Sequence, residues 1–361
     1  MRLLIAGGGT GGHLYPGIAV AEEIVRRGGQ VLFVGTSRGL EVRAVPAAGY
    51  ALELLEVSGL KRVGLLATLR GLSRLPKAFF RSLAILRRFR PDVVLGVGGY
   101  ASGPVVLAAA LWGYPTAIQE QNSVPGITNR ILARLVRVVL IAFDEVRRFF
   151  PTGKTESIGN PVRSKLVATL TAGAGNDERS ASPRILVVGG SQGARAVNDL
   201  VLAAVEVLAN KNSLPALVHQ TGPSDQDRCS ERYRAMGAAD RVEVRPFIDD
   251  MAAEYRRASL VIARAGALTL AELAIAGRPA ILIPLPTAAD DHQSKNAARF
   301  AAASAAIVLN QRTSTGADLA QLLSDLLADS GRRQAMAAAM RSLARPNAAA
   351  DIVDRLERLG V

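Results

Sequence analysis

The amino-acid sequence predicts an α/β protein built from two Rossmann-like, doubly wound domains. Short runs of valine, isoleucine and leucine alternate with segments in which apolar residues recur at helical spacing, which indicates a parallel sheet covered by helices on both faces. The pattern is interrupted once and then restarts with a similar opening, since residues 2–12 and 184–194 are both an apolar run followed by glycines. Because ligands of such sheets lie beyond the carboxyl ends of the strands, we expect a cleft between the two domains.

Eleven apolar runs are the predicted strands. The first half contributes Leu3–Ala6, Val31–Val34, Val93–Val97, Thr116–Gln119 and Val138–Ala142. The second half contributes Ile185–Val188, Leu217–His219, Val242–Val244, Leu260–Ala263, Ala280–Ile283 and Ala305–Val308. The interruption lies at Ala172–Pro183, a stretch rich in Gly, Ser, Asn and Pro that is typical of a linker or an exposed loop.

Composition restricts the class of protein and its location. A chain of 361 residues with 49% hydrophobic and 21% charged residues is neither disordered nor collagen-like nor a disulfide scaffold. The net charge is +13, and the first 160 residues carry 20 basic against 10 acidic side chains, so this half is expected to meet an anionic partner. The single cysteine, Cys229, and a start without a signal-peptide pattern predict the cytoplasm, and no apolar run reaches the ~20 residues of a membrane span.

The first glycine-rich turn is a candidate anion site. Gly7, Gly9 and Gly12 satisfy the GxGxxG spacing between a predicted strand and a helix, where free backbone N–H groups can face an anion. The second strand ends in Gly35–Ser37 without the acidic residue that a dinucleotide ribose requires, which disfavours NAD. A tight turn without any ligand is the alternative.

Polar residues lie at three further points of the first half. His13 follows the turn at once, and an imidazole can take a proton from an attacking hydroxyl near neutral pH. The alternative is a histidine that caps the helix start. The segments Gly96–Pro104 and Glu120–Asn122 place glycines and amides after two more strands, which is where loops carry function.

The second half repeats the arrangement with a hydroxyl and a carboxylate. Gly189–Gly193 contains Ser191, which suits a phosphate oxygen. In Arg264–Glu272 the amides of Ala267–Thr269 can bind a diphosphate while Glu272 accepts from ribose hydroxyls. The alternative is a capping box between Thr269 and Glu272.

Metal ligation is not expected anywhere in the chain. Asp290–Gln293 precedes a helix and suits a sugar better than a metal ion, and Asp225–Asp227 is predicted to be a solvated loop. His219 interrupts an apolar strand and is predicted to be a hydrogen-bonded core residue.

The segment Lys61–Arg90 carries nine basic and no acidic residues, interleaved with leucine and phenylalanine. Apolar side chains flanked by cations are what a segment needs to bind an anionic membrane surface. The alternative is a solvated helix that buries one face. Nucleic acid is disfavoured as a partner because no recognised binding module is present and only 4% of residues are aromatic.

Seven motifs occur in an order that resembles the MurG family of bacterial N-acetylglucosaminyltransferases. They run from residue 1 to about residue 300 and consist of Gly8–Gly17 (GGTGGHLYPG), Gly98–Pro104 (GGYASGP), Glu120–Asn122 (EQN), Gly159–Arg163 (GNPVR), Gly189–Ala194 (GGSQGA), Phe247–Met251 (FIDDM) and Ala265–Glu272 (AGALTLAE). The segment Asp290–Asn296 varies within the family.

The resemblance implies a GT-B fold with a cleft between two Rossmann-like domains. The acceptor and membrane domain would span 1–162, completed by a C-terminal helix at about 346–361, and the donor domain 163–345. The implied enzyme transfers N-acetylglucosamine from UDP-N-acetylglucosamine (UDP-GlcNAc) with inversion. No cofactor or metal ion is expected, because helix N-termini and glycine-rich loops can stabilise the leaving UDP. The implied acceptor is the muramyl 4-hydroxyl of undecaprenyl-pyrophosphoryl-N-acetylmuramyl-pentapeptide (lipid I), which becomes lipid II at the cytoplasmic face of the membrane.

The resemblance also implies a role for individual residues. His13 is the candidate catalytic base, while Ile248 would lie by the uracil, Glu272 by the ribose and Ser191 by the phosphates. Donor contacts carry over by motif to Thr10, Gly11, Gly12, Asn122, Arg163, Ser191, Ile248, Ala267, Leu268, Thr269, Leu270, Ala271, Glu272 and Gln293.

Two other functions fit parts of the sequence. A UDP-GlcNAc 2-epimerase has a similar fold but needs neither the basic apolar segment nor a lipid acceptor. A non-catalytic nucleotide-sugar binding protein would not need a proton acceptor at His13.

Overall fold

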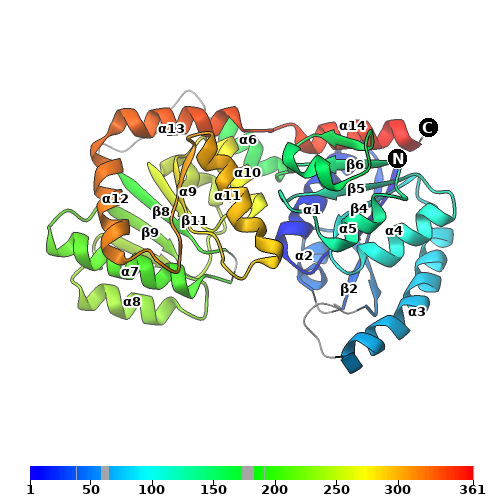
Figure 1. Cartoon of the computed structure of the whole chain (residues 1–361), viewed down its shortest axis with the longest axis horizontal. Helices are drawn as coiled ribbons and strands as arrows, with labels where there is room; N and C mark the ends of the chain where they lie inside the picture. The colour runs from blue at the N-terminus through cyan, green and yellow to red at the C-terminus, as the bar shows by residue number, and fades with distance from the viewer. Residues whose placement is uncertain (38, 58–64, 173–182, 191, 361) are drawn as a thin grey trace. The chain divides into compact units, whose positions relative to one another are not determined.

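The structure is a computed structural model that describes residues 1–37, 39–57, 65–172, 183–190 and 192–360, with side chains described from residue 75 onward in the segment that resumes at residue 65 (Figure 1). The chain divides into two compact units: unit 1 comprises Met1–Ser164 and Arg345–Val361, and unit 2 comprises Lys165–Ala344. Apart from its two end residues, the linker predicted at Ala172–Pro183 lies outside the described residues.

Unit 1 is a doubly wound sheet of parallel strands in the order β3-β2-β1-β4-β5-β6-β7. The strands are β1 (Arg2–Gly7), β2 (Gln30–Thr36), β3 (Ala51–Leu55), β4 (Val93–Gly98), β5 (Thr116–Glu120), β6 (Val138–Ile141) and β7 (Thr155–Ser157). The sequence analysis missed β3 and β7. Both are edge strands, and they lack a continuous apolar run because β3 is partly exposed and β7 consists of Thr, Glu and Ser.

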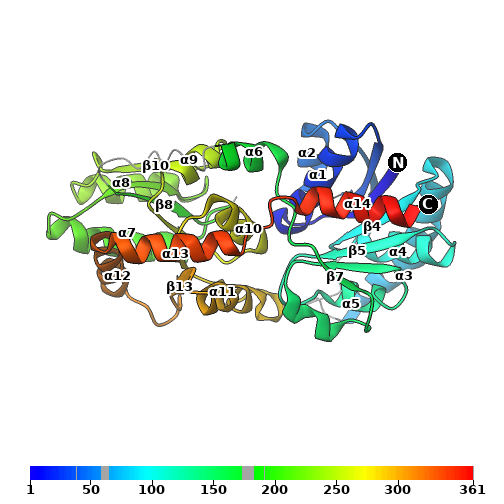
Figure 2. The same cartoon turned by 90° about the horizontal axis from the view of Figure 1, so that it is seen from above.

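Two layers of helices cover the sheet of unit 1, and both can be followed in Figure 2. One layer contains α1 (Gly11–Arg26), α2 (Glu41–Ala47) and α14 (Ala348–Gly360), and the other contains α3 (Leu65–Phe89), α4 (Ser102–Leu111), α5 (Ile127–Leu132) and η1 (Asp144–Phe149). The C-terminal helix α14 buries Ile352, Val353 and Leu356 in the same core cluster as Ile18 of α1. The last residues of the chain therefore belong to the unit that contains the first.

Unit 2 repeats this architecture with strands in the order β10-β9-β8-β11-β12-β13, all of them predicted. They are β8 (Arg184–Val188), β9 (Ala216–Gln220), β10 (Val242–Arg245), β11 (Leu260–Ala263), β12 (Ala280–Leu282) and β13 (Ala306–Val308). The helices are α6 (Ser164–Ala172), α7 (Arg195–Asn210), α8 (Gln226–Ala235), α9 (Met251–Arg257), α10 (Ala267–Ala276), η2 (Ala289–Asp291), α11 (His292–Ala302), α12 (Gly316–Ala328) and α13 (Ser330–Ser342). The predicted α/β fold class is confirmed in both units.

Each sheet reverses its strand order beside its first strand. In unit 1, β1 lies between β2 and β4, and in unit 2, β8 lies between β9 and β11. Loops that leave two such neighbouring strands go to opposite faces of the sheet, which leaves a crevice at the carboxyl ends where ligands bind. The ends of β1 and β4, and those of β8 and β11, are therefore the places to look for a site.

Candidate active site

The glycine-rich turn after β1 is held by a buried carboxylate. Glu41 of α2 is fully buried, and its oxygens accept hydrogen bonds from the Gly9 N–H (2.7 Å) and from the Thr36 N–H and hydroxyl (2.8 Å each). A Cβ at Gly8 would lie 2.4 Å from the Glu41 carboxyl carbon, so glycine is required there. The prediction that this turn offers its N–H groups to a ligand is therefore wrong for Gly9, whose amide binds an internal anion.

The ionised state of Glu41 is stabilised by these contacts. Burial acts to raise the pKa of the carboxyl, but the hydrogen bonds from Gly9 and Thr36 outweigh it and hold the pKa below its usual value. The sequence analysis missed this residue because it lies 32 positions beyond Gly9. The only local signal was an acidic residue just after Gly35 and Gly39.

The start of α1 retains amides for a ligand. The first helical hydrogen bonds run from the N–H groups of His13 and Leu14 to the Thr10 carbonyl, so Gly11 and Gly12 precede them. Thr10 makes no side-chain cap, and the first turn contains no acidic residue. The positive end of this helix therefore lies beside the turn that Glu41 fixes.

His13 is anchored by a residue from the end of β5. Its Nδ1 lies 2.9 Å from Oε1 of Gln121, and Gly98 at the end of β4 leaves room for the ring, because a Cβ there would lie 2.8 Å from Nδ1. The alternative that His13 caps the helix start is wrong, since the ring bonds to Gln121 instead. Within the described residues, Nε2 has no hydrogen-bond partner.

Two further predicted residues of unit 1 lie near these elements. Glu120 is buried and accepts from the backbone and side chain of Asn122 (3.0 and 3.4 Å), which fixes the loop after β5. The guanidinium of Arg163 lies 5.4 Å from the centre of the Tyr15 ring on α1. In unit 1, Asn122 thus directly follows Gln121, the residue that binds His13, and the side chain of Arg163 packs against α1.

The start of α10 in unit 2 is an open helix N-terminus. Its N-cap residue Gly266 is extended and makes no side-chain cap, and the first backbone bond runs from Leu270 to Gly266. Ala267, Leu268 and Thr269 consequently have amides without helical partners, as the functional interpretation requires. The capping-box alternative is wrong, because the helix begins at Ala267 and Thr269 is not its N-cap.

Side chains from neighbouring elements fix this helix start. The buried Tyr255 of α9 donates its hydroxyl to Glu272 (3.0 Å), and burial raises the Tyr255 pKa well above its usual value. The buried Asn296 donates to the Ala265 carbonyl (3.2 Å), while Gln293 accepts from the Leu285 amide (3.0 Å). The carboxylate of Glu272 and the amide of Gln293 are thereby oriented at the carboxyl edge of the sheet.

Of the remaining predicted donor residues, some are described by the structure and others are not. Ser191, the hydroxyl of the second glycine-rich turn, lies outside the described residues. Ile248 follows β10 and is 2% exposed. The turn itself is tightly packed, since a Cβ at Gly193 would lie 2.0 Å from the Thr221 carbonyl oxygen.

Other residues that the sequence singled out are structural. His219 is fully buried and hydrogen-bonded, as predicted. The solvated loop predicted at Asp225–Asp227 is wrong, because α8 begins at Gln226 and Asp225 is buried against Asn198 and Arg228. In the described part of the chain, no three His, Cys, Asp or Glu residues are grouped so as to hold a metal ion.

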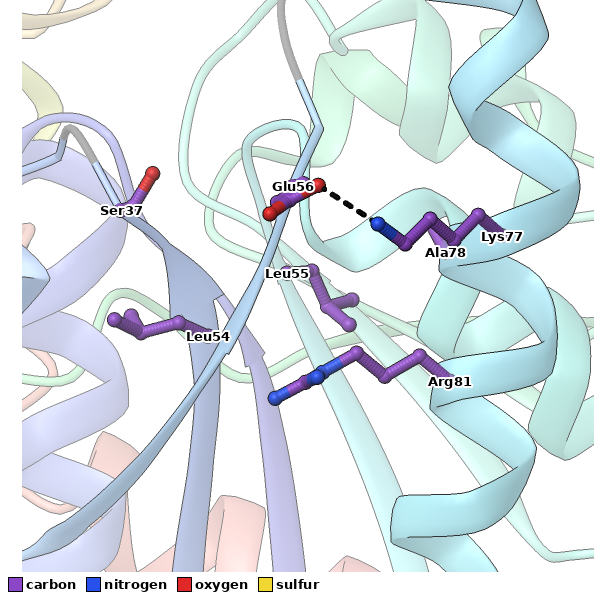
Figure 3. Close-up of a pocket in the computed structure, with 7 residues that line it drawn as sticks. All are labelled: Ser37, Leu54, Leu55, Glu56, Lys77, Ala78 and Arg81. Carbon is purple, nitrogen blue, oxygen red and sulfur yellow. Dashed lines mark hydrogen bonds and ion pairs between the residues drawn. The ribbon is translucent and has the colours of Figure 1, made fainter.

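A small cavity lies in unit 1 between the ends of β2 and β3 and helix α3 (Figure 3). It has a volume of about 280 Å³ and is lined by Ser37, Leu54, Leu55, Glu56, Lys77, Ala78 and Arg81. Lys77 pairs with Glu56 (3.2 Å) across its mouth. Two cations of α3, Lys77 and Arg81, therefore lie near the carboxyl ends of β2 and β3.

The described part of α3 is amphipathic. Ala78, Leu83 and Leu86 are buried, whereas Lys77 and Arg81 are exposed. Phe80 is an apolar residue on the exposed side, with 68% of its surface accessible. The predicted basic segment Lys61–Arg90 is described only in part, since residues 61–64, and the side chains of 65–74, lie outside the described residues.

Exposed apolar side chains continue from α3 onto the end of α4. Leu111 and Trp112 are 60% and 48% exposed, the ring centres of Phe79 and Trp112 are 6.3 Å apart, and Arg87 lies over the Trp112 ring at 5.7 Å. We call Phe79, Phe80, Arg87, Leu111 and Trp112 the aromatic patch. The sequence analysis missed Leu111 and Trp112, although the single tryptophan at the end of an apolar helix was a signal.

Comparisons with known proteins agree with this architecture. Residues 3–141 match the glycosyltransferase family 28 N-terminal domain, and residues 184–356 match the C-terminal domain of the same family. The chain is 49% identical over 356 residues to the UDP-N-acetylglucosamine--N-acetylmuramyl-(pentapeptide) pyrophosphoryl-undecaprenol N-acetylglucosamine transferase of Anaeromyxobacter dehalogenans, covering 98% of this chain and 92% of that protein.

Solved structures divide into a close relative and proteins that share the fold alone. The crystal structure of MurG from Acinetobacter baumannii is similar with a TM-score of 0.79 and 33% identity, covering 99% of each chain. The UDP-GlcNAc 2-epimerase of Neisseria meningitidis has a TM-score of 0.69 at only 13% identity, with 99% of this chain and 100% of the other covered. No helix among the described residues is long and apolar enough to cross a membrane. From the motifs, both domain matches and the identity over nearly its whole length, this chain belongs to the MurG family of glycosyltransferases.

Proposed function

We propose that this protein transfers N-acetylglucosamine from UDP-GlcNAc to the muramyl 4-hydroxyl of lipid I, giving lipid II. The observation that carries the proposal is the 49% identity over 98% of the chain to a transferase named for that reaction. The geometry supports it, because each unit presents a helix N-terminus at a topological switch point.

We assign the donor chiefly to unit 2 and the acceptor to unit 1. The open start of α10 suits the diphosphate, since its N–H groups and dipole stabilise the negative charge that develops on the leaving UDP. Glu272 would accept from the ribose hydroxyls, and Ile248 would lie by the uracil. The other proposed donor contacts are Thr10, Gly11, Gly12, Asn122, Arg163, Ser191, Ala267, Leu268, Thr269, Leu270, Ala271 and Gln293.

His13 is the proposed base. Its Nε2 would take the proton of the muramyl 4-hydroxyl as that oxygen forms a bond to the anomeric carbon, while the bond from that carbon to the diphosphate oxygen breaks. UDP departs with the bonding electron pair, and the configuration inverts. A positioned base of this kind typically contributes 10²–10⁴-fold to the rate.

The first test is acceptor dependence. UDP release from UDP-GlcNAc is measured in detergent with and without a lipid I analogue. We expect UDP only when the acceptor is present, together with a disaccharide product. UDP released without the acceptor, with free N-acetylmannosamine, would instead establish an epimerase, and donor binding without any turnover would indicate a binding protein.

We further propose that α3 and the aromatic patch bind the cytoplasmic face of the membrane, where lipid I is anchored. Exposed aromatic side chains beside cations are suited to the interface of an anionic bilayer. Lys77, Arg81 and Arg88 add exposed cations on the same helix. Surface charge of this kind adds about 1 kcal/mol per basic residue near anionic lipid.

The single tryptophan makes this docking measurable. Trp112 fluorescence is followed as phosphatidylglycerol vesicles are added, and a blue shift is expected that high salt reduces. The quadruple change of Lys77, Arg81, Arg87 and Arg88 to Ser should weaken vesicle binding severalfold. The matched control changes four exposed arginines of unit 2 to Ser, namely Arg232, Arg234, Arg241 and Arg257. Equal weakening in the control would overturn docking through α3.

A further inference from the structure

The amide of Gln121 can have only one orientation. Gln121 is fully buried at the end of β5, and its Nε2 lies 2.9 Å from the Val97 carbonyl oxygen. A carbonyl oxygen only accepts, so the amide nitrogen must face Val97 and the amide oxygen must face Nδ1 of His13. A flipped amide would set two acceptors against each other in a buried site, at a cost of about 1–3 kcal/mol.

This orientation fixes the tautomer of His13. Since Oε1 of Gln121 accepts, Nδ1 of the neutral imidazole must carry the proton. The lone pair is then on Nε2, which is the nitrogen without a hydrogen-bond partner in the described residues. Only this tautomer can act as a base through Nε2.

Gln121 is itself the middle of a chain of amides. Its Nε2 also donates to the side-chain oxygen of Gln119, and Gln119 donates to Oδ1 of Asn160 (3.3 Å). Gln119, Gln121 and Asn160 are all buried, and they contribute no charge. Each oxygen points back toward the histidine, so the aligned dipoles polarise one another and favour a proton arriving on the imidazole.

We propose that Gln121 is a positioning residue that holds His13 as the Nδ1–H tautomer, with Gln119 and Asn160 completing an uncharged relay. The inference rests on the proposed function, in which His13 is the base. An aspartate or glutamate does this work in serine-hydrolase triads. Here an amide keeps the orientation without adding a negative charge beside a site for anionic substrates.

Ionisable groups on the surrounding elements have other partners. Glu41 of α2 is bound by Gly9 and Thr36, and Glu120 of β5 is bound by Asn122, Gly126 and Asn129. Tyr15 of α1 lies under Arg163. Gln121 is the residue hydrogen-bonded to the His13 ring in the described structure.

The decisive variant is Gln121→Glu, which keeps the shape and the acceptor but adds charge. A carboxylate beside the imidazole favours the protonated ring, so the acidic limb of the kcat/KM against pH profile should move to higher pH by about one to three units. Gln121→Met, which removes the acceptor, should lower kcat by about 10–100-fold with the KM for UDP-GlcNAc nearly unchanged, as for other residues that orient a reacting group.

Two controls keep the test decisive. UDP affinity and the melting temperature of each variant show that it is folded, and Gln226→Glu on unit 2 makes the same change outside the relay without moving the pH profile. If folded Gln121→Glu has an unshifted profile of kcat/KM against pH and His13→Ala is inactive, the relay is overturned. The proposed transferase activity and the role of His13 as the base would not be affected by that result. Full turnover by folded His13→Ala would instead show that His13 is not the base.

Discussion

Two histidines in this chain are hydrogen-bonded to side-chain amides, but they differ in whether a ring nitrogen is left to accept a proton. His13 is partly exposed and uses one ring nitrogen, Nδ1, on Gln121. His219 is fully buried and uses both, with Nδ1 on the Tyr233 hydroxyl (2.7 Å) and Nε2 on Asn198 (3.1 Å). Burial is the main cause that lowers the pKa of His219 to about 3.

The difference teaches how to separate a reactive histidine from a structural one. Asn198 donates its amide to the Thr221 carbonyl, so its oxygen must accept from Nε2–H of His219, and Nδ1 then accepts from Tyr233. A ring whose donor and acceptor are both occupied within the core has no site for a substrate proton. His13 has the opposite tautomer and leaves its acceptor nitrogen unbonded in the described structure.

The largest expected effect comes from replacing each histidine by glutamine. His13→Gln should reduce kcat by about 10²–10⁴-fold, because an amide cannot accept the proton, with little change in melting temperature. His219→Gln should leave kcat of the folded enzyme nearly unchanged but lower the free energy of unfolding by about 1–3 kcal/mol, because it disturbs two buried hydrogen bonds. Parallel kinetics and thermal melts check both, and an equal loss of kcat in the two variants would break the comparison.

The pH dependence of stability gives the next effect. The pKa of His219 is about 3 in the folded protein against 6.5 for the free side chain, so below pH 6.5 the unfolded state binds a proton that the folded state does not. This group's contribution to stability is complete above pH 6.5 and declines by up to about 1.4 kcal/mol per pH unit as the pH falls toward 3. Between pH 6.5 and pH 4 the wild type should lose about 3 kcal/mol from this group, as much as the gap expected at pH 7. Urea unfolding of the wild type and of His219→Gln should therefore give stabilities that meet or cross by pH 4, and a constant gap between pH 7 and pH 4 would contradict this pKa.

A smaller acid-dependent effect is expected at the first glycine-rich turn, where Glu41 rather than a histidine is the buried ionisable group. Its pKa is held below the usual 4.5, so its contribution to stability is present above that pH and is lost as the pH falls through the lowered value. Glu41→Gln should cost about 1–2 kcal/mol at pH 7, because the amide nitrogen faces donors. That deficit should shrink only below about pH 4.5, a lower range than for His219, as urea titrations can show.

Much of the fold was predictable because each buried parallel strand is marked by a continuous apolar run in its own segment of the sequence. A central strand can therefore be predicted without information about the strands beside it, as Leu260–Ala263 illustrates with four fully buried residues. The edge strand β7, Thr155–Ser157, has no such run, and it forms because β6 offers it hydrogen bonds. Pairing with a neighbour is a tertiary property that composition does not record.

The site divides in the same way. The glycine turns, His13 and the start of α10 follow from short motifs, whereas Glu41, Gln121 and Tyr255 were not predicted as contacts. His13 and Gln121 are 108 positions apart, and only the sheet order brings them together. The false capping box arose because Thr269–Glu272 has the right spacing, although the N-cap of the helix is Gly266, three residues before Thr269.

The smallest expected effect tests whether both nitrogens of His219 matter. Tyr233→Phe removes the hydroxyl that donates to Nδ1 and keeps the buried ring, so it should cost about 1 kcal/mol of unfolding free energy with kcat unchanged. The same change at Tyr255, whose hydroxyl donates to Glu272, serves as the matched control because it should also raise the KM for UDP-GlcNAc. Loss of stability without any KM effect at Tyr233, and a KM effect at Tyr255, would distinguish a hydrogen bond that serves the core from one that serves the donor site.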